Sequence, residues 1–428
     1  MNHSRLTRCT VAALAIALFA VAAAVLLVRS GYPDEPTAEA DTVAVDLSTS
    51  AVERGAYLAR VGDCAACHTT PGGREYAGGR TIETPFGAVF STNLTPDAAT
   101  GIGRWSAGDF WKALHTGQAK GGRLLYPAFP YPNFTFVTRQ DSDAIYAYLR
   151  TLNPVAQSNR PHALRFPYNQ QAALAVWRAL YFRAGSFESQ PEMSSQWNRG
   201  AYLVRGLAHC GACHSTRNAL GSTSARHEFD GGAIPEQDWY APSLRAADEA
   251  SMAGWAVDDV VHLLRTGQGP HGSVLGPMAE VVYRSTQHVS EEDLRAMASF
   301  LRTLPRTPSA PRDAVHGVDA GLLRKGAAVY KDRCAGCHAD NGEGLPGAYP
   351  SLVQNRAVLL NPPTNVVRVV LDGGFAPATT GNPRPYGMPP FRQALSNAEV
   401  AAVVTYVRNA WGNAAGGVSE VDVLRATR

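Results

Sequence analysis

Three short segments of the sequence share one pattern of residues that can do chemistry, namely two cysteines three positions apart followed directly by a histidine. Two thiols at this spacing can add to the two vinyl groups of one haem, and the adjoining histidine can then bind the iron as its proximal ligand. The pattern therefore predicts three covalently bound haem c groups. The segments are Cys64-Ala-Ala-Cys67-His68, Cys210-Gly-Ala-Cys213-His214 and Cys334-Ala-Gly-Cys337-His338.

A single Cys-x-x-Cys pair also fits a redox-active disulfide or one half of a zinc site. A thioredoxin-like pair needs no adjoining histidine and comes with a βαβ pattern, which is not found in this sequence. A zinc ribbon needs a second cysteine pair about 15 to 20 residues further on. Three pairs, each followed directly by histidine, favour haem over both alternatives.

Length and charge set the broad class of protein. The chain has 428 residues, 45% of them hydrophobic and 18% charged, with a formal net charge of +3. This length has room for two to four globular domains of ordinary composition. The small net charge and the lack of a basic cluster predict no binding to nucleic acid.

The N-terminus carries an apolar run, Val11 to Val28, preceded by Arg5 and Arg8. As a helix it would span about 27 Å, close to the hydrocarbon thickness of a bilayer. We expect an uncleaved single-pass anchor in the cytoplasmic (inner) membrane, with the bulk of the chain in the periplasm. A cleaved signal peptide is the alternative, but the small-x-small site that Ala38 to Ala40 offers lies twelve residues beyond the run. Cys9 has no assigned role.

Each motif is preceded by a segment that predicts a short helix containing one glycine for close approach of another helix. The segments begin at Arg54, Arg199 and Arg324 and carry Tyr57, Tyr202 and Tyr330, respectively. After each motif follow a helix that stops at glycine and then an amphipathic helix with a capping start. The glycine-stopped helices are Trp105 to Gly117, Trp255 to Gly267 and Asn365 to Gly373, and the final helices are Asp141 to Leu152, Ser290 to Leu304 and Ser396 to Trp411.

These elements predict a mostly α-helical chain of consecutive haem domains. A further helix is expected over Gln171 to Phe182, and the Gly/Ala-rich tail is expected to lie on the surface. The expected division is an anchor and linker over 1–50, domain 1 over 51–153, an interdomain segment over 154–196, domain 2 over 197–306, domain 3 over 307–411 and a tail over 412–428.

The six methionines of the sequence are few enough for their placement to be informative. Met278 and Met388 lie at equivalent places after the second and third motifs, and each is next to a proline. Methionine is often core filler, but this placement favours thioether ligation of the iron at haems two and three. The matching residue after the first motif is Phe129, which cannot bind iron.

Further motifs between about Arg54 and Arg408 are similar to those of one family, the three-haem cytochrome c subunits of membrane-associated periplasmic dehydrogenases. The resemblance implies three consecutive small helical cytochrome c domains, which we expect behind the N-terminal transmembrane helix. It also implies a partner subunit, which in the family is a quinoprotein alcohol dehydrogenase, a flavin-dependent gluconate, sorbitol or fructose dehydrogenase, or a molybdenum hydroxylase. The motifs are Thr84 to Gly87, Ser91 to Asn93, Thr95 to Asp97, Thr100 to Gly103, Leu125 to Ala128, Trp197 to Tyr202, His209 to His214, Arg217-Asn218, Gly276 to Met278 and Met388 to Phe391.

The first haem departs from the family pattern. The alcohol dehydrogenase branch places methionine where Phe129 stands, whereas phenylalanine there is similar to the branch paired with molybdenum hydroxylases. In that branch a histidine is often found at the position of Asn133. The chain follows neither pattern completely at this haem.

The function predicted from the haem motifs and the resemblance is electron transfer. A dehydrogenase would oxidise its substrate by two electrons, and the haems would pass them singly to membrane quinone or to a terminal oxidase. The alternative is a peroxidase, a small-molecule reductase or a gas-binding protein that uses an open iron at haem one. Such an enzyme needs a distal acid or base, and around Phe129 the sequence offers Tyr126, Tyr131 and Asn133 but no carboxylate or histidine. His115 and His162 are expected to be exposed polar residues, so the chain is not expected to be catalytic on its own.

Overall fold

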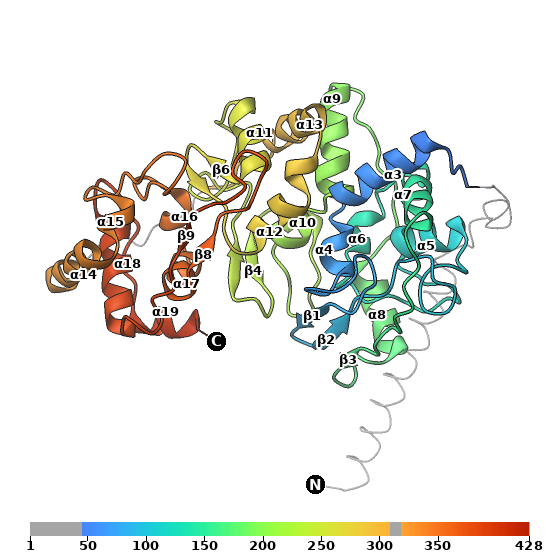
Figure 1. Cartoon of the computed structure of the whole chain (residues 1–428), viewed down its shortest axis with the longest axis horizontal. Coiled ribbons are helices and arrows are strands. Elements are labelled where there is room, and N and C mark those ends of the chain that lie inside the picture. Colours follow the sequence, from blue (N-terminus) through green and yellow to red (C-terminus); the bar gives the residue numbers. More distant parts are fainter. Residues whose placement is uncertain (1–44, 309–317, 428) are drawn as a thin grey trace, which may run out of the picture. The chain divides into compact units, whose positions relative to one another are not determined.

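The computed structural model describes residues 45–308 and 318–427. Most regular elements in these residues are helices, and the strands have two to four residues each, as the sequence predicts (Figure 1). The contacts divide the chain into two compact units. Unit 1 comprises residues up to Ala56 and His68–Phe187, and unit 2 comprises Tyr57–Cys67 and Glu188–Arg428.

Unit 1 contains helices and one small antiparallel sheet in the order β1-β2-β3. The first helix, α3, begins in this unit and continues into the segment that belongs to unit 2. The elements are α3 (Thr49–Val61), α4 (Cys64–His68), β1 (Thr81–Thr84), β2 (Gly87–Phe90), α5 (Ala107–Thr116), α6 (Tyr131–Phe134), α7 (Arg139–Arg150), β3 (Ala163–Leu164) and α8 (Gln171–Tyr181).

The first half of unit 2 carries the second cysteine motif. Its elements are α9 (Ser195–Tyr202), the π-helix η1 (Leu203–Leu207), α10 (Gly211–His214), η2 (Ala225–His227), β4 (Gly232–Ile234), β5 (Trp239–Ala241), α11 (Val257–Thr266), β6 (Gln268–Gly269), β7 (Gly272–Ser273), α12 (Pro277–Arg284), η3 (Thr286–His288) and α13 (Glu291–Leu301).

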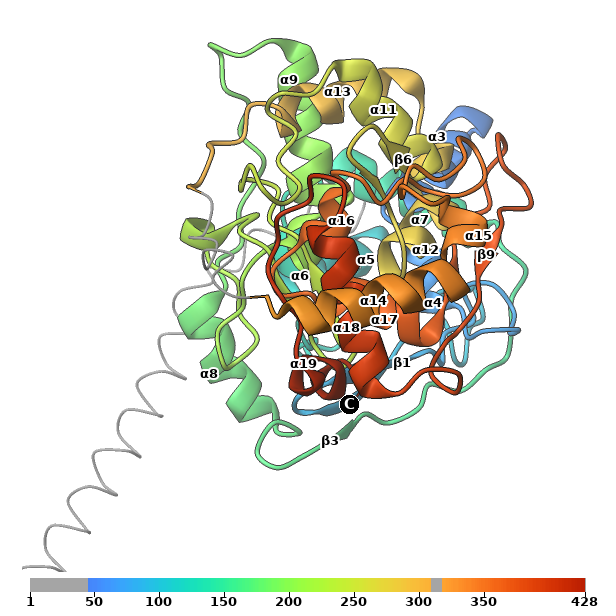
Figure 2. The same cartoon turned by 90° about the vertical axis from the view of Figure 1, so that its left-hand side faces the viewer.

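The second half of unit 2 carries the third motif, and Figure 2 shows α14 crossing in front of α18. Its elements are α14 (Ala320–Arg333), α15 (Ala335–His338), α16 (Arg356–Leu359), α17 (Thr364–Asp372), β8 (Gly374–Phe375), β9 (Gly387–Met388), α18 (Asn397–Asn409) and α19 (Glu420–Arg425).

The glycine in the helix before each cysteine motif does bring two helices together. A Cβ added at Gly55 would collide with the carbonyl of Ala144 in α7, and one at Gly200 would collide with Ala296 in α13. Gly326 lies in the same way against Ala402 in α18. A larger residue would force the helices apart at these contacts, so the predicted close approach is confirmed.

The predicted helix ends are also confirmed to within a few residues. Helices α5 and α11 end at Gly117 and Gly267, which have φ of 64° and 75°. Helix α13 begins with Ser290 as its N-cap, and Ser396 forms a capping box at the start of α18. These local signals could be recognised from the sequence because each depends on residues next to the helix end.

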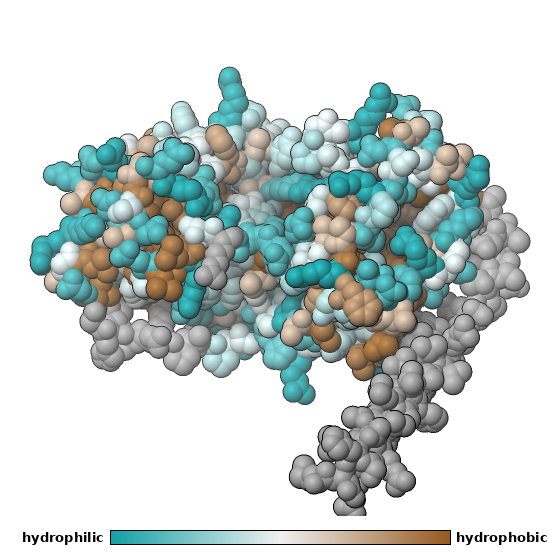
Figure 3. All heavy atoms as spheres, turned by 90° about the horizontal axis from the view of Figure 1, so that it is seen from below, coloured by the Kyte–Doolittle hydropathy of each residue, from teal (hydrophilic) through white to brown (hydrophobic). Residues whose placement is uncertain are grey.

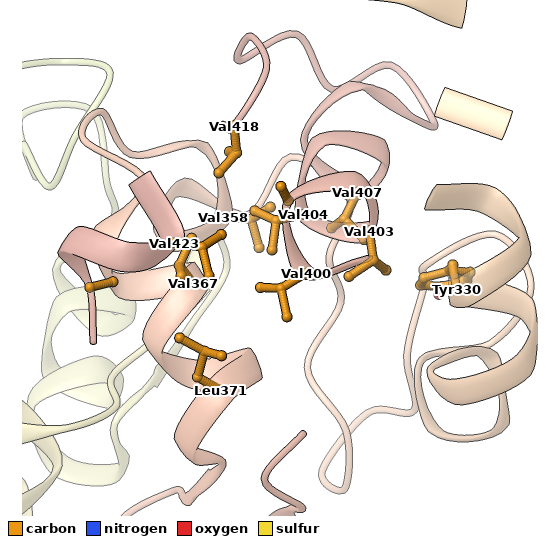
Figure 4. Close-up of a cluster of buried hydrophobic side chains, with 12 residues drawn as sticks. Tyr330, Val358, Val367, Leu371, Val400, Val403, Val404, Val407, Val418 and Val423 are labelled. Atoms are coloured by element: carbon orange, nitrogen blue, oxygen red, sulfur yellow. The ribbon is translucent and has the colours of Figure 1, made fainter. Parts of the chain in front are cut away.

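The hydrophobic core around the third motif is rich in valine and is drawn in Figure 4. The guanidinium of Arg408 is buried in this part of the molecule and donates to the carbonyls of Val358, Leu360 and Ala415 at 2.6, 2.7 and 2.5 Å. The C-terminal tail does not lie wholly on the surface as expected. Val423 in α19 is completely buried in the core, because the capping box of Ser419 starts a short amphipathic helix that packs on α18.

The expected membrane anchor needs a correction. The run Val11 to Val28 lies outside the described residues, and among the residues that are described no helix combines the length and apolar content that a bilayer crossing requires. The longest of them, α14, has 14 residues and extends about 21 Å, which is shorter than a hydrocarbon core of about 30 Å. The expected fold class is therefore wrong in its transmembrane helix, and the single-pass membrane localisation is not supported.

Candidate haem sites

Each of the three cysteine motifs forms or borders a short helix. These are α4, α10 and α15, and each follows the close-packed helix described above. None of the six motif cysteines is in a disulfide. Cys67 and Cys337 are exposed and the other four are partly buried, so the thiols are accessible to a ligand that lies along these helices.

The histidine of each motif is held by one main-chain carbonyl. The Nδ1 atom lies 2.7 Å from the carbonyl oxygen of Thr92 for His68, and 2.7 Å from that of Pro242 for His214. For His338 the acceptor is Pro350, at 3.1 Å. Because a carbonyl can only accept, Nδ1 must carry the proton in all three rings. The lone pair of the neutral imidazole is then on Nε2, the arrangement found in metal-binding histidines.

Burial keeps these histidines in the state that can bind iron. Removal from water lowers the pKa of His68, His214 and His338, against a smaller opposite effect of the carbonyl hydrogen bond. The imidazoles are therefore neutral at neutral pH. A neutral ring that donates through Nδ1 and offers Nε2 is suited to be a proximal ligand.

The cysteines do not have the properties of a redox-active pair. Burial raises the pKa of Cys64 and Cys210 to about 12 and that of Cys334 to about 11. Reactive cysteines in Cys-x-x-Cys redox sites have pKa values lowered below about 8.5. The raised pKa values of Cys64, Cys210 and Cys334 are the opposite of what a redox-active pair needs.

The segment that carries Met388 lies close to the third motif. Tyr386, two residues earlier, packs on Tyr349 with 5.2 Å between ring centroids. The Tyr349 hydroxyl is in turn hydrogen-bonded to the thiol of Cys337. Figure 3 shows hydrophobic surface over this C-terminal part of the molecule, at the left of the view. Leu345 and Tyr386 are 55% and 63% exposed and are suitable to contact a large apolar cofactor.

The segment that carries Met278 is tied to the second motif by a different contact. A Cβ at Gly276 would meet the indole ring of Trp239, which lies in β5. This strand leads directly to Pro242, the residue whose carbonyl holds His214. Met278 itself is partly buried at the start of α12.

The corresponding segment of unit 1 is connected to the first motif in a similar way. The backbone N–H of Phe90 donates to Nδ1 of His162 at 3.2 Å, and the His162 ring meets Tyr126 edge-on at 5.3 Å. Phe90 is two residues before Thr92, which holds His68. Phe129 lies three residues after Tyr126 and packs on Phe134 at 5.4 Å. A chain of contacts thus connects the Phe129 segment with the segment that holds His68.

The two other histidines of this region have structural roles, and neither is exposed as expected. His162 accepts a hydrogen bond at Nδ1, so the neutral ring carries its proton on Nε2 and cannot bind iron there. His115 donates from Nδ1 to the Thr135 carbonyl at 2.9 Å and stacks on Trp111 at 4.3 Å. Sequence reasoning missed both contacts because the partners are distant in sequence or in a loop.

The donor set fits haem c at each motif. Six thiols outside disulfides would form the thioethers, and three oriented neutral imidazoles would bind iron. Bound haem supplies reversible one-electron chemistry at the iron. The residues of this chain would attach the group and orient its axial ligand.

Comparison with known proteins identifies cytochrome c domains in this chain. A family model described as cytochrome c matches residues 52–153 and 323–411, which contain the first and third motifs. The cytochrome c subunit of alcohol dehydrogenase (quinone) from Gluconobacter oxydans (strain 621H) is 39% identical over 90% of this chain and 84% of that protein. The cytochrome c subunit of gluconate 2-dehydrogenase from Pantoea cypripedii is 38% identical over 85% of this chain and 86% of that protein.

A third relative, a component of nicotinate dehydrogenase from Pseudomonas putida, is larger than this chain. It is 42% identical over 85% of this chain, which spans 30% of that protein. The histidine and cysteine geometry, the matched family model and the nearly full-length relatives lead to one conclusion. The chain belongs to the family of cytochrome c electron-transfer subunits of dehydrogenase complexes.

Proposed function

We propose that the chain binds three haem c groups and passes electrons singly from a partner dehydrogenase subunit to a quinone or a terminal oxidase. The observation that carries this proposal is the repeated arrangement of His68, His214 and His338. Each follows a cysteine pair and donates from Nδ1 to a carbonyl. The middle motif has the same geometry as the two motifs inside the matched family regions, which supports a haem at all three.

Met278 and Met388 are the distal ligands of haems two and three in this proposal. The contacts between Gly276 and Trp239 and between Tyr386 and Tyr349 support it, because each ties the methionine segment to the surroundings of a motif. A thioether ligand raises the reduction potential of the iron. Haems two and three would therefore be the better electron acceptors, and haem one would be the low-potential centre.

The domain organisation proposed with this function is a haem domain over 51–153, a second over 197–306 and a third over 307–411. The partner would be the catalytic subunit of a dehydrogenase, as in the relatives named for alcohol, gluconate and nicotinate oxidation. The substrate would be chosen by that subunit, since the proposed roles of this chain need no substrate pocket.

The proposal is tested by redox titration of the purified holoprotein. Three one-electron transitions are expected, with two iron centres showing the near-infrared charge-transfer band of sulfur ligation. Met278→Leu and Met388→Leu should each remove about half of that band and lower one potential. Met193→Leu is the matched control, because it replaces a methionine that lies outside the proposed ligand segments. A band unchanged in both ligand variants would refute the ligand assignment.

A further inference from the structure

The second cysteine motif is followed by an arginine whose positive charge is not neutralised by a carboxylate. Arg217 lies three residues after His214, and its Nη2 atom donates to the carbonyl of Ala212, which lies between the two motif cysteines. Its Nη1 atom is buried and has no hydrogen-bond partner in the part of the chain that the structure describes. Within residues 45–308 and 318–427, Arg217 also forms no ion pair with an acidic side chain. Buried polar atoms without partners are rare in proteins, so this guanidinium calls for an explanation.

Arg217 is held next to the motif by its backbone as well as by its side chain. It forms an isolated antiparallel bridge with Thr223. The hydroxyl of the preceding Thr216 donates to the Gly231 carbonyl at 2.7 Å. Together with the hydrogen bond to Ala212, these contacts fix both ends of the residue. The positive charge therefore stays beside the motif.

The charge of Arg217 acts on the thiol of Cys213. Burial raises the pKa of Cys213, and the positive charge of Arg217 opposes this rise. Burial likewise lowers the pKa of Arg217, and a negative charge on Cys213 opposes that change. The two side chains are thus close enough for their charges to interact. Because the Cys213 sulfur would form a thioether with haem two, the guanidinium lies beside the edge at which this haem is attached.

Other arginines in the same half of unit 2 are paired with carboxylates. Arg205 lies 3.1 Å from Glu228, and Arg245 lies 2.9 Å from Asp230. The opposite charges of such a pair largely cancel at a distance. These arginines therefore have little effect on a haem at the second motif, whereas the charge of Arg217 acts at full strength.

An uncompensated cation beside a haem changes its reduction potential. Ferric haem carries one more positive charge than ferrous haem, so a nearby positive charge destabilises the ferric state more. The effect is strong where water is excluded, because a low dielectric constant screens charges poorly. A fixed positive charge next to the second motif should therefore raise the potential of haem two.

The other two motifs have no cation at the equivalent place. Three residues after the motif histidine, the first motif has Pro71 and the third has Asn341. The charged residues that follow the third motif closely are Asp340 and Glu343, both of which are exposed. Negative charges would lower the potential of haem three, although water and salt screen exposed carboxylates. The difference in charge therefore favours reduction of haem two over haem three.

We propose that Arg217 raises the reduction potential of haem two and makes it the highest-potential centre of the chain. The inference rests on the proposed function, since it needs a haem at the second motif. A single electron in the chain would then stay on haem two. The iron of haem two would change from ferric to ferrous, and the ferrous iron that supplied the electron would become ferric.

The test is redox titration of the purified holoprotein with and without the charge. Arg217→Gln removes the charge but keeps an N–H donor for the Ala212 carbonyl. It should lower the highest of the three potentials by about 59 mV, which corresponds to a tenfold change in the equilibrium constant for reduction. Arg217→Lys keeps the charge and should retain most of the wild-type potential. Arg226→Gln is the matched control and should change nothing, because Arg226 is exposed to solvent.

The transition that is lowered in Arg217→Gln should be the one that Met278→Leu also lowers, since both changes act on haem two. Unchanged potentials in Arg217→Gln would overturn the inference. Equal lowering in Arg217→Gln and Arg217→Lys would overturn it too, because the effect would then come from lost packing and not from lost charge. The wild-type protein gives an independent check that needs no Arg217 variant. If its Met278-dependent transition lies below its Met388-dependent transition, haem two is not the highest-potential centre.

Haem content separates this inference from the function on which it rests. A pyridine haemochrome assay on the same samples should give three haems per chain in the wild type and in both Arg217 variants. Three haems with unchanged potentials would overturn only the role of Arg217. A wild-type chain without haem at Cys210 and Cys213 would contradict the proposed function itself.

Discussion

Gly276 packs against the indole ring of Trp239, and three residues beyond Trp239 the carbonyl of Pro242 holds Nδ1 of His214. Strand β5 and the proline that follows it therefore contact both the Met278 segment and the histidine of the second motif. Because Gly276 has φ of 57°, a side chain here would be strained and would also collide with the indole.

Replacing Gly276 with alanine should displace Met278 and leave the attachment of haem two intact. The expected result is loss of about half of the sulfur-ligation band and a lower potential for one haem, since thioether ligation raises potential. Near-infrared magnetic circular dichroism and redox titration measure both. Gly254→Ala is the control, because its added Cβ would make only an ordinary contact with the Arg306 side chain. An unchanged band in Gly276→Ala would place Met278 away from the iron.

Phe129 cannot bind iron, so haem one should be five-coordinate or should take a nitrogen ligand from elsewhere in the chain. If it is five-coordinate, the reduced wild-type protein should bind one carbon monoxide per chain. Phe129→Met should abolish this binding and raise the potential of haem one by adding a sulfur ligand. Met278→Ala should instead open a second carbon monoxide site.

Optical titration with carbon monoxide counts these sites. A wild-type protein that binds none, with three equivalent sulfur-ligated haems, would show that the alignment of Phe129 with the methionines is wrong. A wild-type protein that binds none but has only two sulfur-ligated haems would instead indicate a nitrogen ligand at haem one.

Arg408 should be important for the stability of the C-terminal part of unit 2. Arg408 is 1% exposed and its guanidinium donates to three carbonyls, and replacement by leucine would leave those acceptors without this partner. We expect a loss of about 3 kcal/mol or more in the free energy of unfolding. Chemical denaturation of the holoprotein measures this loss. Arg425→Leu should have little effect, since the Arg425 side chain is 74% exposed.

The sequence predicts the helices and the haem motifs well because both are encoded locally. The cysteine and histidine spacing, the capping residues Ser290 and Ser396, and the terminal glycines Gly117 and Gly267 each act on neighbouring residues. Helix-contact glycines such as Gly200 are predictable for the same reason, because they recur at a fixed place before the motif.

Other features depend on contacts between distant residues and are not predictable in this way. The carbonyl that orients each histidine lies 12 to 28 residues away in a loop. Val423 in α19 is buried only because α18 provides the complementary surface. The hydrogen bond from Gln287 to the Ala378 carbonyl joins residues that are 91 positions apart in the sequence.

The central claim is that the middle motif carries a haem like the other two. The direct measurement is mass spectrometry of the denatured chain and of its tryptic peptides. The protein for this measurement is produced in a host with a c-type maturation system. The intact mass should correspond to three haems, and the peptide with Cys210 and Cys213 should carry one of them through two thioethers. Cys210→Ala combined with Cys213→Ala should reduce the content to two. A wild-type chain with two haems and an unmodified Cys210 to Cys213 peptide would contradict the account.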